Sequence, residues 1–339
     1  MREKITIQQI AELAGVSKFA VSRALSGKSG VSNETREKIL KVAGQLGYFN
    51  RKSSAGAETA PQDDGAVKPG TIVVLFPNIQ YQNHDSPYWG PVFDGIASRL
   101  SQRGCDIVML TEPSEEKVFS LLNPKAIQGI ITLGVISTRI LLEIKRLDIP
   151  VVMVDYEDPA FLTDTVFVDN ISSMRELMLR LISRGYKSFQ FVGDIRSVPS
   201  FRDRWIAFRS VLEEFGMESR PHPVLTGPES GDKLWKHLPT VLDEVRPDVF
   251  VCVNDITAVE VISGLVRKGR KVPDDCGVTG FDNTHADNEH GLALTTVNVD
   301  KEWMGRRAVD KLFWRLANRE ARKEKTLIAA DVIMGNSTR

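Results

Sequence analysis

The chain has 339 residues, of which 42% are hydrophobic, and its 44 basic and 44 acidic side chains give no net charge. No apolar run approaches the roughly 20 residues that a membrane-spanning helix needs, and the charged N-terminal stretch does not fit a secretory signal peptide. We therefore expect a cytoplasmic protein without membrane contact. Three widely spaced cysteines, Cys105, Cys252 and Cys276, form no C-x-x-C pair, which argues against a disulfide framework or a zinc site.

Charge is unevenly distributed along the chain. Residues 1–53 hold ten basic and four acidic side chains, whereas the other 286 residues hold 34 basic and 40 acidic ones. A basic segment supplies the phosphate contacts that give most of the sequence-independent affinity for DNA. The N-terminal segment therefore favours DNA binding over a purely structural or protein-binding role.

Residues 5–48 have the pattern of a helix-turn-helix. Two short amphipathic helices meet at Gly15-Val16-Ser17 and are followed by a third helix. We expect a turn at Gly15, where a residue without Cβ is least strained, and an N-cap at Ser17. The apolar positions of the first two helices, which can share one small core, are Ile7, Ile10, Ala11, Ala14, Ala20, Val21, Ala24 and Leu25.

The second of these helices has the polar face of a recognition helix, whose N-terminal residues meet base edges in the major groove. Arg can donate two hydrogen bonds to guanine, Lys can donate to a base edge or to phosphate, and Phe can pack on a thymine methyl. A second interpretation of Phe19 is partial burial against the third helix. The side chains expected to project outward are Lys18, Phe19, Ser22, Arg23 and Ser26.

Residues 51–70 are rich in Ala, Gly, Ser, Pro and Asp and lack apolar periodicity, so they predict a linker. From residue 71 onward short apolar strands alternate with amphipathic helices, which predicts parallel sheets of βαβ units. The strands are too many for one sheet, so we expect two doubly wound lobes with a ligand in the cleft between them. Strands are expected at 71–76, 106–111, 129–134, 150–155, 165–169, 188–193, 222–227, 249–255, 277–282 and 294–300, and helices at 91–103, 114–122, 138–146, 172–184, 202–215, 231–244 and 257–268.

Motifs for catalysis or cofactor binding are missing from the sequence. It has neither the G-x-G-x-x-G of dinucleotide-binding folds nor the G-x-x-x-x-G-K-[ST] of phosphate-binding loops. It has no G-x-S-x-G elbow, and its five histidines do not have the spacing of metal ligands. We therefore expect no enzyme activity, no cofactor and no bound metal.

Short motifs in both halves of the chain resemble the LacI/GalR-type (lactose-repressor) family of bacterial regulators. They are GVS at 15–17, VSRALSG at 21–27, VS at 31–32, TR at 35–36, LGY at 46–48, VCVND at 251–255, KVPDDCGVTGFDN at 271–283 and LTTVNVD at 294–300. The resemblance implies an all-α, three-helix headpiece at 1–50, the linker at 51–70 and an α/β, type I periplasmic-binding-protein-like sensor at 71–339. It also implies a homodimeric repressor of transcription that binds double-stranded operator DNA.

In that family the first two residues of the recognition helix after its Ser, together with the Arg of the VSR motif, select the operator. In this chain they are Lys18, Phe19 and Arg23. The full set of DNA-binding residues that we predict is Thr6, Ser17, Lys18, Phe19, Ser22, Arg23, Ser26, Ser32, Thr35 and Tyr48.

The linker departs from the family pattern. Typical members have a hinge helix here with an Ala-Arg-x-Leu motif, whose Leu enters the minor groove of a kinked operator. Residues 51–70 contain no Leu, and Gly56, Pro61 and Gly65 disfavour a helix. We interpret the segment as a flexible tether, the alternative being a sequence that orders only on DNA.

The predicted effector-binding residues follow strand ends or match the family's site. Asp282 ends a strand, and a carboxylate that faces an Arg side chain suits paired hydroxyls. The resemblance places Arg204 at the family's effector-binding Arg, and Tyr88 and Trp89 at its aromatic positions. Asp255 is left out because we expect it to cap the helix that follows. The predicted set is Tyr88, Trp89, Asp155, Ser200, Arg204, Asn254 and Asp282.

A sugar or sugar derivative is the preferred effector. Purine-responsive members have an Arg and a Thr where this chain has Val198 and Ser200, which disfavours a purine. A nucleobase or other non-sugar metabolite is the alternative. Lys301 stands where some sugar-binding members have an aromatic residue, and it indicates either an acidic sugar or a solvated lysine.

Effector binding is expected to act on DNA binding through allostery, because a ligand shifts a conformational equilibrium by its differential affinity for the two states. Two headpieces on one dimer would then read half-sites about one helical turn apart. Candidates for the dimer face are the helix at 92–100 and the apolar residues at 140–144.

Overall fold

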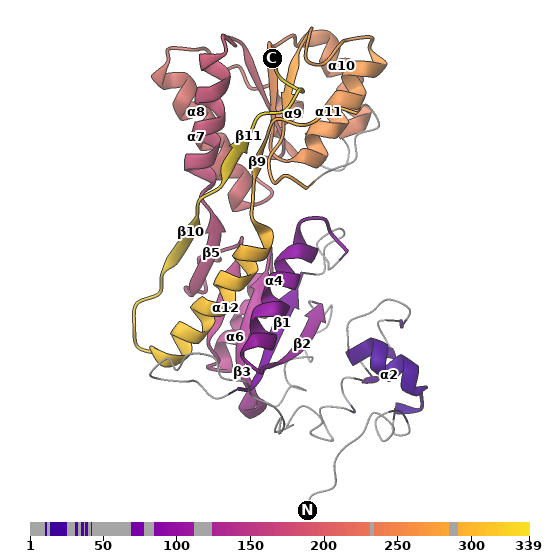
Figure 1. Ribbon diagram of the computed structural model, residues 1–339, viewed down its shortest axis with the longest axis vertical. Coiled ribbons are helices and arrows are strands. Elements are labelled where there is room, and N and C mark those ends of the chain that lie inside the picture. The colour runs from indigo at the N-terminus through magenta and orange to yellow at the C-terminus, as the bar shows by residue number, and fades with distance from the viewer. Residues whose placement is uncertain are drawn as a thin grey trace, which may run out of the picture. The chain divides into compact units, whose positions relative to one another are not determined.

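The computed structural model places two units along the chain (Figure 1). Unit 1 is Met1–Val166 with Glu302–Lys325, and unit 2 is Phe167–Lys301 with Thr326–Arg339. The structure describes residues 11, 14–25, 31–32, 35–36, 38–39, 42, 69–77, 85–111, 124–230, 234–284 and 291–339. Within these ranges no helix is both long enough and apolar enough to cross a membrane.

The described part of the headpiece has the predicted turn and second helix. Helix α2 covers Lys18–Leu25. Gly15 has a φ of +65°, the left-handed conformation that a Cβ would disfavour. The hydroxyl of Ser17 accepts a hydrogen bond from the Ala20 amide at 3.1 Å, so the predicted N-cap is confirmed. A small apolar core lies beneath and consists of Ala11, Ala14, Val21, Ala24 and Ile39.

Unit 1 is built on a six-stranded sheet with the order β10-β5-β4-β3-β1-β2. Strands β1 to β5 pair in parallel along this order, as expected for βαβ units. Its central strands are buried on both faces, which explains their unbroken runs of Val, Ile and Leu. The strands are β1 (Thr71–Phe76), β2 (Asp106–Thr111), β3 (Ile127–Leu133), β4 (Val151–Val154), β5 (Asp164–Val168) and β10 (Lys325–Ile328).

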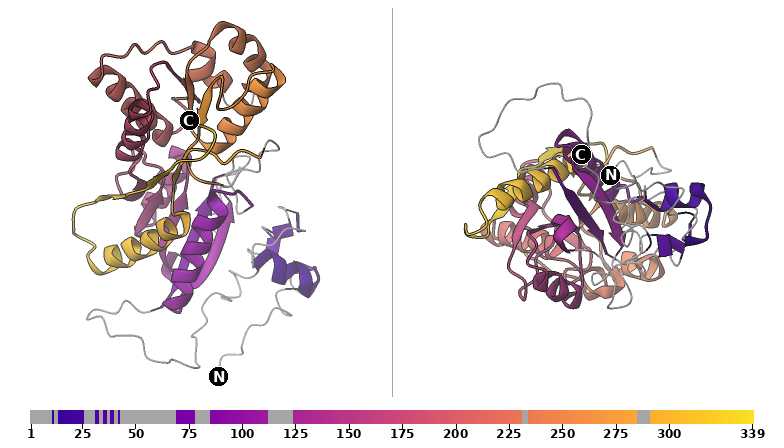
Figure 2. Two further views of the ribbon diagram at one scale, coloured as in Figure 1. Left: turned by 45° about the horizontal axis from the view of Figure 1, so that its top comes forward. Right: turned by 90° about the horizontal axis from the view of Figure 1, so that it is seen from below.

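The described helices of unit 1 include α4 (Trp89–Gln102), α6 (Thr138–Arg146) and α12 (Lys301–Ala317), with a 3₁₀ turn at Pro124–Ala126. Helices α4 and α12 lie side by side (Figures 1 and 2). A Cβ built at Gly95 would come within 2.0 Å of the Glu302 carbonyl oxygen, and one at Gly305 within 2.0 Å of the Val92 carbonyl oxygen. The two backbones approach so closely that only glycine fits at both positions.

The predicted dimer face stays a prediction, although several of its apolar side chains are buried within the protomer. Along 92–100, the side chains of Val92, Ile96 and Leu100 are fully buried within the protomer. The apolar residues at 140–144 that face inward belong to the core of unit 1. Each helix uses its apolar stripe to cover its own unit, as amphipathic surface helices do, so these side chains are not free for a second protomer.

Unit 2 contains a parallel three-stranded sheet with the order β6-β7-β8 and an antiparallel pair of β9 and β11. Helices α10 and α11 bury their apolar faces in one core with the sheet. The strands are β6 (Phe189–Val192), β7 (Val249–Cys252), β8 (Gly277–Thr279), β9 (Thr296–Asn298) and β11 (Asp331–Ile333), and the helices are α7 (Asn170–Ser183), α8 (Pro199–Glu214), α9 (Pro223–Thr226), α10 (Leu234–Glu244) and α11 (Asp255–Arg267), with a 3₁₀ turn at Pro228–Ser230.

One predicted element of unit 2 is wrong. The expected strand at 222–227 is the short helix α9. Pro223 fits the first turn of a helix, and the His222 carbonyl accepts hydrogen bonds from the amides of Leu225 and Thr226. Helix α12 and strands β10 and β11 were not predicted. The expected helix at 114–122 and residues 51–68 of the predicted linker lie outside the described residues.

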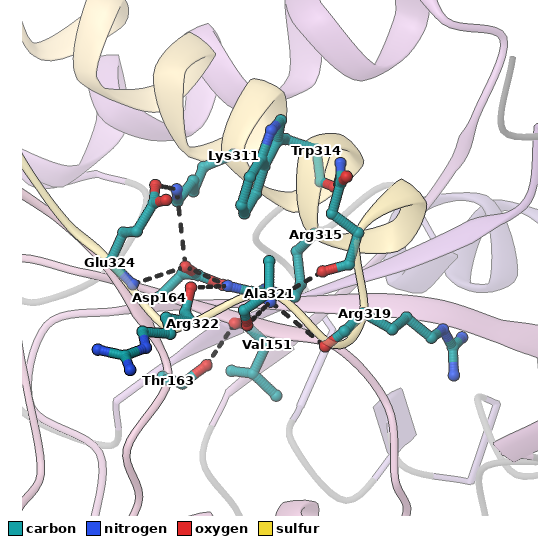
Figure 3. A network of polar contacts seen from close by, with 11 residues as sticks. Val151, Thr163, Asp164, Lys311, Trp314, Arg315, Arg319, Ala321, Arg322 and Glu324 are labelled. Atoms are coloured by element: carbon teal, nitrogen blue, oxygen red, sulfur yellow. Dashed lines mark hydrogen bonds and ion pairs between the residues drawn. The ribbon is translucent and has the colours of Figure 1, made fainter. Parts of the chain in front are cut away.

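A buried ion-pair network holds β5, α12 and the approach to β10 together (Figure 3). Asp164 on β5 is fully buried and accepts from Arg315 Nε at 2.5 Å and Nη2 at 3.0 Å. Arg315 also donates to the carbonyl oxygens of Asn318, Arg319, Ala321 and Arg322, which close the turn after α12. Glu324 donates its amide to Asp164 and accepts from Lys311.

Removing one partner of this network should destabilise the protein strongly. We expect Asp164→Ala to lower the free energy of unfolding by about 3–5 kcal/mol, because Arg315 then stays buried without its counter-charge. Urea denaturation measures the loss. The control is Glu214→Ala, which removes an exposed pair with Arg175 and should leave the transition almost unchanged. Equal, small losses for both variants would contradict the prediction.

Candidate functional site

The recognition helix presents a pair of stacked side chains. Phe19 is 68% exposed, so the interpretation that it is buried against the third helix is wrong. The guanidinium carbon of Arg23 lies 5.1 Å from the centre of the Phe19 ring. This is cation–π geometry between residues one helical turn apart. Lys18 is also exposed, at the start of the same helix.

The other predicted DNA contacts divide into described and undescribed residues. Ser17 caps α2, as shown above. Ser32 accepts from the Thr35 amide at 3.2 Å, and the two hydroxyls lie 2.8 Å apart. These hydroxyls therefore shape helix starts in the free protein and remain exposed or half-buried. Thr6, Ser26, Tyr48 and the side chain of Ser22 lie outside the described residues.

Arg204 on α8 is the best-connected residue of the predicted effector set. Its side chain is 2% exposed. Nε donates to Asn170 Oδ1 at 2.8 Å, Nη1 to the Val253 carbonyl at 2.5 Å, and Nη2 to Asp282 Oδ1 at 3.1 Å. The guanidinium also lies 3.6 Å from the centre of the Phe281 ring. Residues from three segments of unit 2 thus fix the orientation of one guanidinium.

Asp282 follows β8 in a strained backbone conformation. Its φ is +100°, and that of Asn283 is +48°. Its amide donates to the Val297 carbonyl at 2.9 Å, which anchors the turn to β9. Burial raises the pKa of the Asp282 carboxyl, and the nearby Arg204 and Lys301 cations partly oppose this effect. The predicted pairing of Arg204 with Asp282 is present in the structure.

The helix cap predicted at Asp255 is wrong, whereas effector binding by Asn254 stays a prediction. Asn254 is the N-cap of α11, and its side chain accepts from the Thr257 amide at 2.9 Å. Asp255 instead accepts from the Thr296 hydroxyl at 2.6 Å and from the Thr284 amide at 2.7 Å. The sequence could not separate the two, since both are good capping residues next to each other.

Ser200 is buried and precedes Arg204 by one turn of α8. In unit 1, Asp155 follows β4 with a φ of +55°. Tyr88 and Trp89 form an edge-to-face pair with ring centres 4.9 Å apart. Trp89 is 7% exposed, which leaves little of its ring for a ligand in this state.

The sequence interpretation missed two contributors to the site. Asn170 opens α7 directly after a buried strand and orients Arg204, and its place at a strand end was a usable signal. Phe281 lies under the guanidinium, and nothing in its sequence position indicates this. Among the described residues no group of three His, Cys, Asp or Glu side chains could hold a metal ion.

The stacked pair on α2 predicts coupled effects on DNA binding. We expect Phe19→Ala to weaken binding to the preferred duplex by about 0.5–1 kcal/mol, because the ring no longer orients Arg23. In an Arg23→Ala background the same change should have no further effect. Fluorescence anisotropy against a duplex selected from random sequences measures both. Lys38→Ala is the control, since an exposed lysine should affect all duplexes evenly. Additive losses would show that the two side chains act independently.

Asp255 predicts a pH dependence of stability. Burial raises its pKa from 3.8 to about 6, so the folded state binds more protons than the unfolded state between these values. The contribution of Asp255 to the free energy of unfolding is therefore most favourable below about pH 4. It falls by about 3 kcal/mol as the pH rises through 6. Denaturation of the wild type and Asp255→Asn between about pH 4 and 7 tests this. Parallel curves for the two proteins would contradict it.

Comparisons with known proteins agree with this architecture. Residues 6–50 match the family model described as bacterial regulatory proteins, lacI family, and residues 179–338 match a periplasmic binding protein-like domain. The chain is 26% identical to the HTH-type transcriptional regulator DegA of Bacillus subtilis (strain 168), over 99% of this chain and 98% of that protein. It is 26% identical to the HTH-type transcriptional repressor PurR of Haemophilus influenzae (strain PittEE), over 93% of this chain and 92% of that protein.

Among solved structures, a complex of the transcriptional regulator CelR with cellobiose aligns over 98% of this chain and 99% of its own, with a TM-score of 0.69 and 22% identity. This likeness supports the predicted fold of a headpiece followed by a type I periplasmic-binding-like domain. The relatives are regulators rather than enzymes. The chain belongs to the LacI family of bacterial regulatory proteins and is a DNA-binding transcriptional regulator.

Proposed function

We propose that this regulator is a repressor whose affinity for operator DNA is controlled by a sugar or sugar derivative, and that unit 2 binds this effector through Arg204 and Asp282. The observation that carries the proposal is the buried contact of 3.1 Å between these two side chains. Buried ion pairs contribute little net stability by themselves. What favours a ligand is the place of the pair, since Asp282 follows β8 at the carboxyl end of a parallel strand, where open α/β sheets bind their ligands.

The chemistry of the pair matches a polyhydroxylated ligand. A guanidinium has five N–H donors, and a carboxylate accepts several hydrogen bonds. Three donors of Arg204 are used within the protein, which leaves two for a ligand. A sugar hydroxyl both donates and accepts, so adjacent hydroxyls can bridge the two side chains. The edge of a nucleobase also offers a donor beside an acceptor, which makes a nucleobase the second candidate.

We propose that DNA recognition uses α2, with Arg23 as the guanine-reading side chain and Lys18 at a base edge or phosphate. Two headpieces of a homodimer would read two half-sites about one helical turn apart. Residues 51–70, of which 51–68 lie outside the described residues, would tether the headpieces without a leucine wedge. The effector would act by favouring one of two dimer geometries, with a coupling free energy equal to its differential affinity for them.

A ligand panel tests the effector assignment. We expect at least one of D-glucose, D-ribose and cellobiose to raise the thermal stability of the wild type, and hypoxanthine to have no effect. Asp282→Asn and Arg204→Met should abolish the response while leaving the unliganded protein able to bind operator, because a polar group of the ligand would lose its buried partner. Asp243→Asn, an exposed change in unit 2, is the control.

The panel also discriminates between the two candidates. Stabilisation by hypoxanthine alone would support a nucleobase. If Asp282→Asn and Arg204→Met respond as the wild type does, neither residue binds the effector and the site is wrongly assigned.

A further inference from the structure

The ammonium group of Lys301 is fully occupied by backbone carbonyls. Lys301 is the first residue of α12 and the last residue of the Phe167–Lys301 segment of unit 2. Its Nζ donates to the carbonyl oxygens of Asp282 at 2.5 Å, Val299 at 3.1 Å and Asn283 at 3.2 Å. An ammonium has three hydrogens, so these three carbonyls use all of its donors. Lys301 is therefore not the solvated lysine considered from the sequence.

Two of those carbonyls belong to the strained turn after β8. Asp282 and Asn283 are consecutive non-glycine residues with positive φ, and each such residue costs on the order of 1–3 kcal/mol unless its surroundings enforce it. The two carbonyl oxygens converge on one nitrogen. The Lys301 ammonium thus offsets the repulsion between two carbonyl dipoles that this backbone conformation brings together.

The rest of the turn is held from its other flanks. The Thr284 amide donates to Asp255 at the start of α11, at 2.7 Å. The Asn283 side chain donates to Asn298 Oδ1 of β9 at 2.9 Å. Behind the turn, a Cβ at Gly280 would come within 2.1 Å of an Asp255 carboxylate oxygen, so that carboxylate lies directly against the backbone. The turn therefore has one conformation with many restraints. Lys301 is the cation on its backbone carbonyl oxygens, whereas Arg204 contacts the Asp282 side chain.

We propose that Lys301 is a positioning residue for effector recognition, which holds the turn at 282–284 so that the Asp282 carboxylate meets Arg204. Lys301 has no N–H left for an anionic group, so it does not bind an acid function of the effector. Among sugars, this favours a neutral one over a uronate or a sugar phosphate that would need Lys301 as its counter-charge. This inference rests on the proposed function, since the turn matters for sensing only if Asp282 binds the effector.

The first test uses the full-length protein without ligand. Lys301→Met keeps the length of the side chain and removes its three donors. We expect the amides of Asp282 and Thr284 to exchange with deuterium about tenfold faster than in the wild type, because the turn opens more often. Lys187→Met, the same change at an exposed lysine of unit 2, should leave both rates unchanged. Unchanged rates in Lys301→Met would overturn the proposal.

A second measurement separates positioning from general support of the fold. The NMR resonance of the Arg204 Nε–H reports the environment of its guanidinium. The position of this resonance in Asp282→Asn is the reference for a guanidinium that has lost its carboxylate partner. We expect Lys301→Met to move this resonance toward that reference. An Arg204 resonance identical to the wild type, in a folded Lys301→Met protein, would show that Lys301 does not act on Asp282.

If Lys301→Met does not fold, Lys301→Arg gives the same comparison. A guanidinium keeps the positive charge but spreads its donors over a plane, so it cannot direct three hydrogens from one nitrogen at the carbonyls. We expect faster exchange at Asp282 and Thr284 here as well, whereas wild-type rates would show that charge alone is sufficient and would overturn the proposal. These measurements need no effector. The effect of Lys301 on the turn can therefore be established even if the ligand panel shows that Asp282 binds no effector.

Discussion

The buried contact between Arg204 and Asp282 is the constraint on which the organisation of unit 2 depends. A charged group leaves water at a large cost unless other groups replace its hydration. Here the replacement comes from Asn170 on α7, the carbonyl that follows β7, and the ring of Phe281. Helices and strands that are far apart in sequence must therefore meet at one guanidinium, and a shift of any of them changes its environment.

This dependence explains why the backbone after β8 is strained. To reach Arg204, the chain adopts two consecutive left-handed residues, a conformation that sequence-local preferences oppose. The compensation comes from outside the turn, through α11, β9 and Lys301. Strain that is enforced by several neighbours is typical of positions where a protein must present one side chain in one orientation.

The sequence predicted what depends on periodicity and on strand ends. Continuous apolar strands, most helix positions, the cap at Ser17 and the place of Asp282 at a strand end follow from such local patterns. The pairing of Asp282 with Arg204 was implied by the family resemblance. Prediction from the sequence failed where the outcome depends on tertiary packing. Asn254 and Asp255 are chemically similar neighbours, and only the tertiary contacts of Asp255 with Thr284 and Thr296 decide which one caps the helix.

The glycine contact between α4 and α12 limits how unit 1 can be exchanged between proteins by recombination. Its two halves are separated in sequence by most of unit 2, yet their backbones touch at Gly95 and Gly305. A gene fragment that ends at residue 166 would encode the sheet without the helix that covers α4, and Asp164 without Arg315. Unit 1 therefore cannot be exchanged between proteins as one contiguous segment, and recombination at its boundaries has to carry both stretches together.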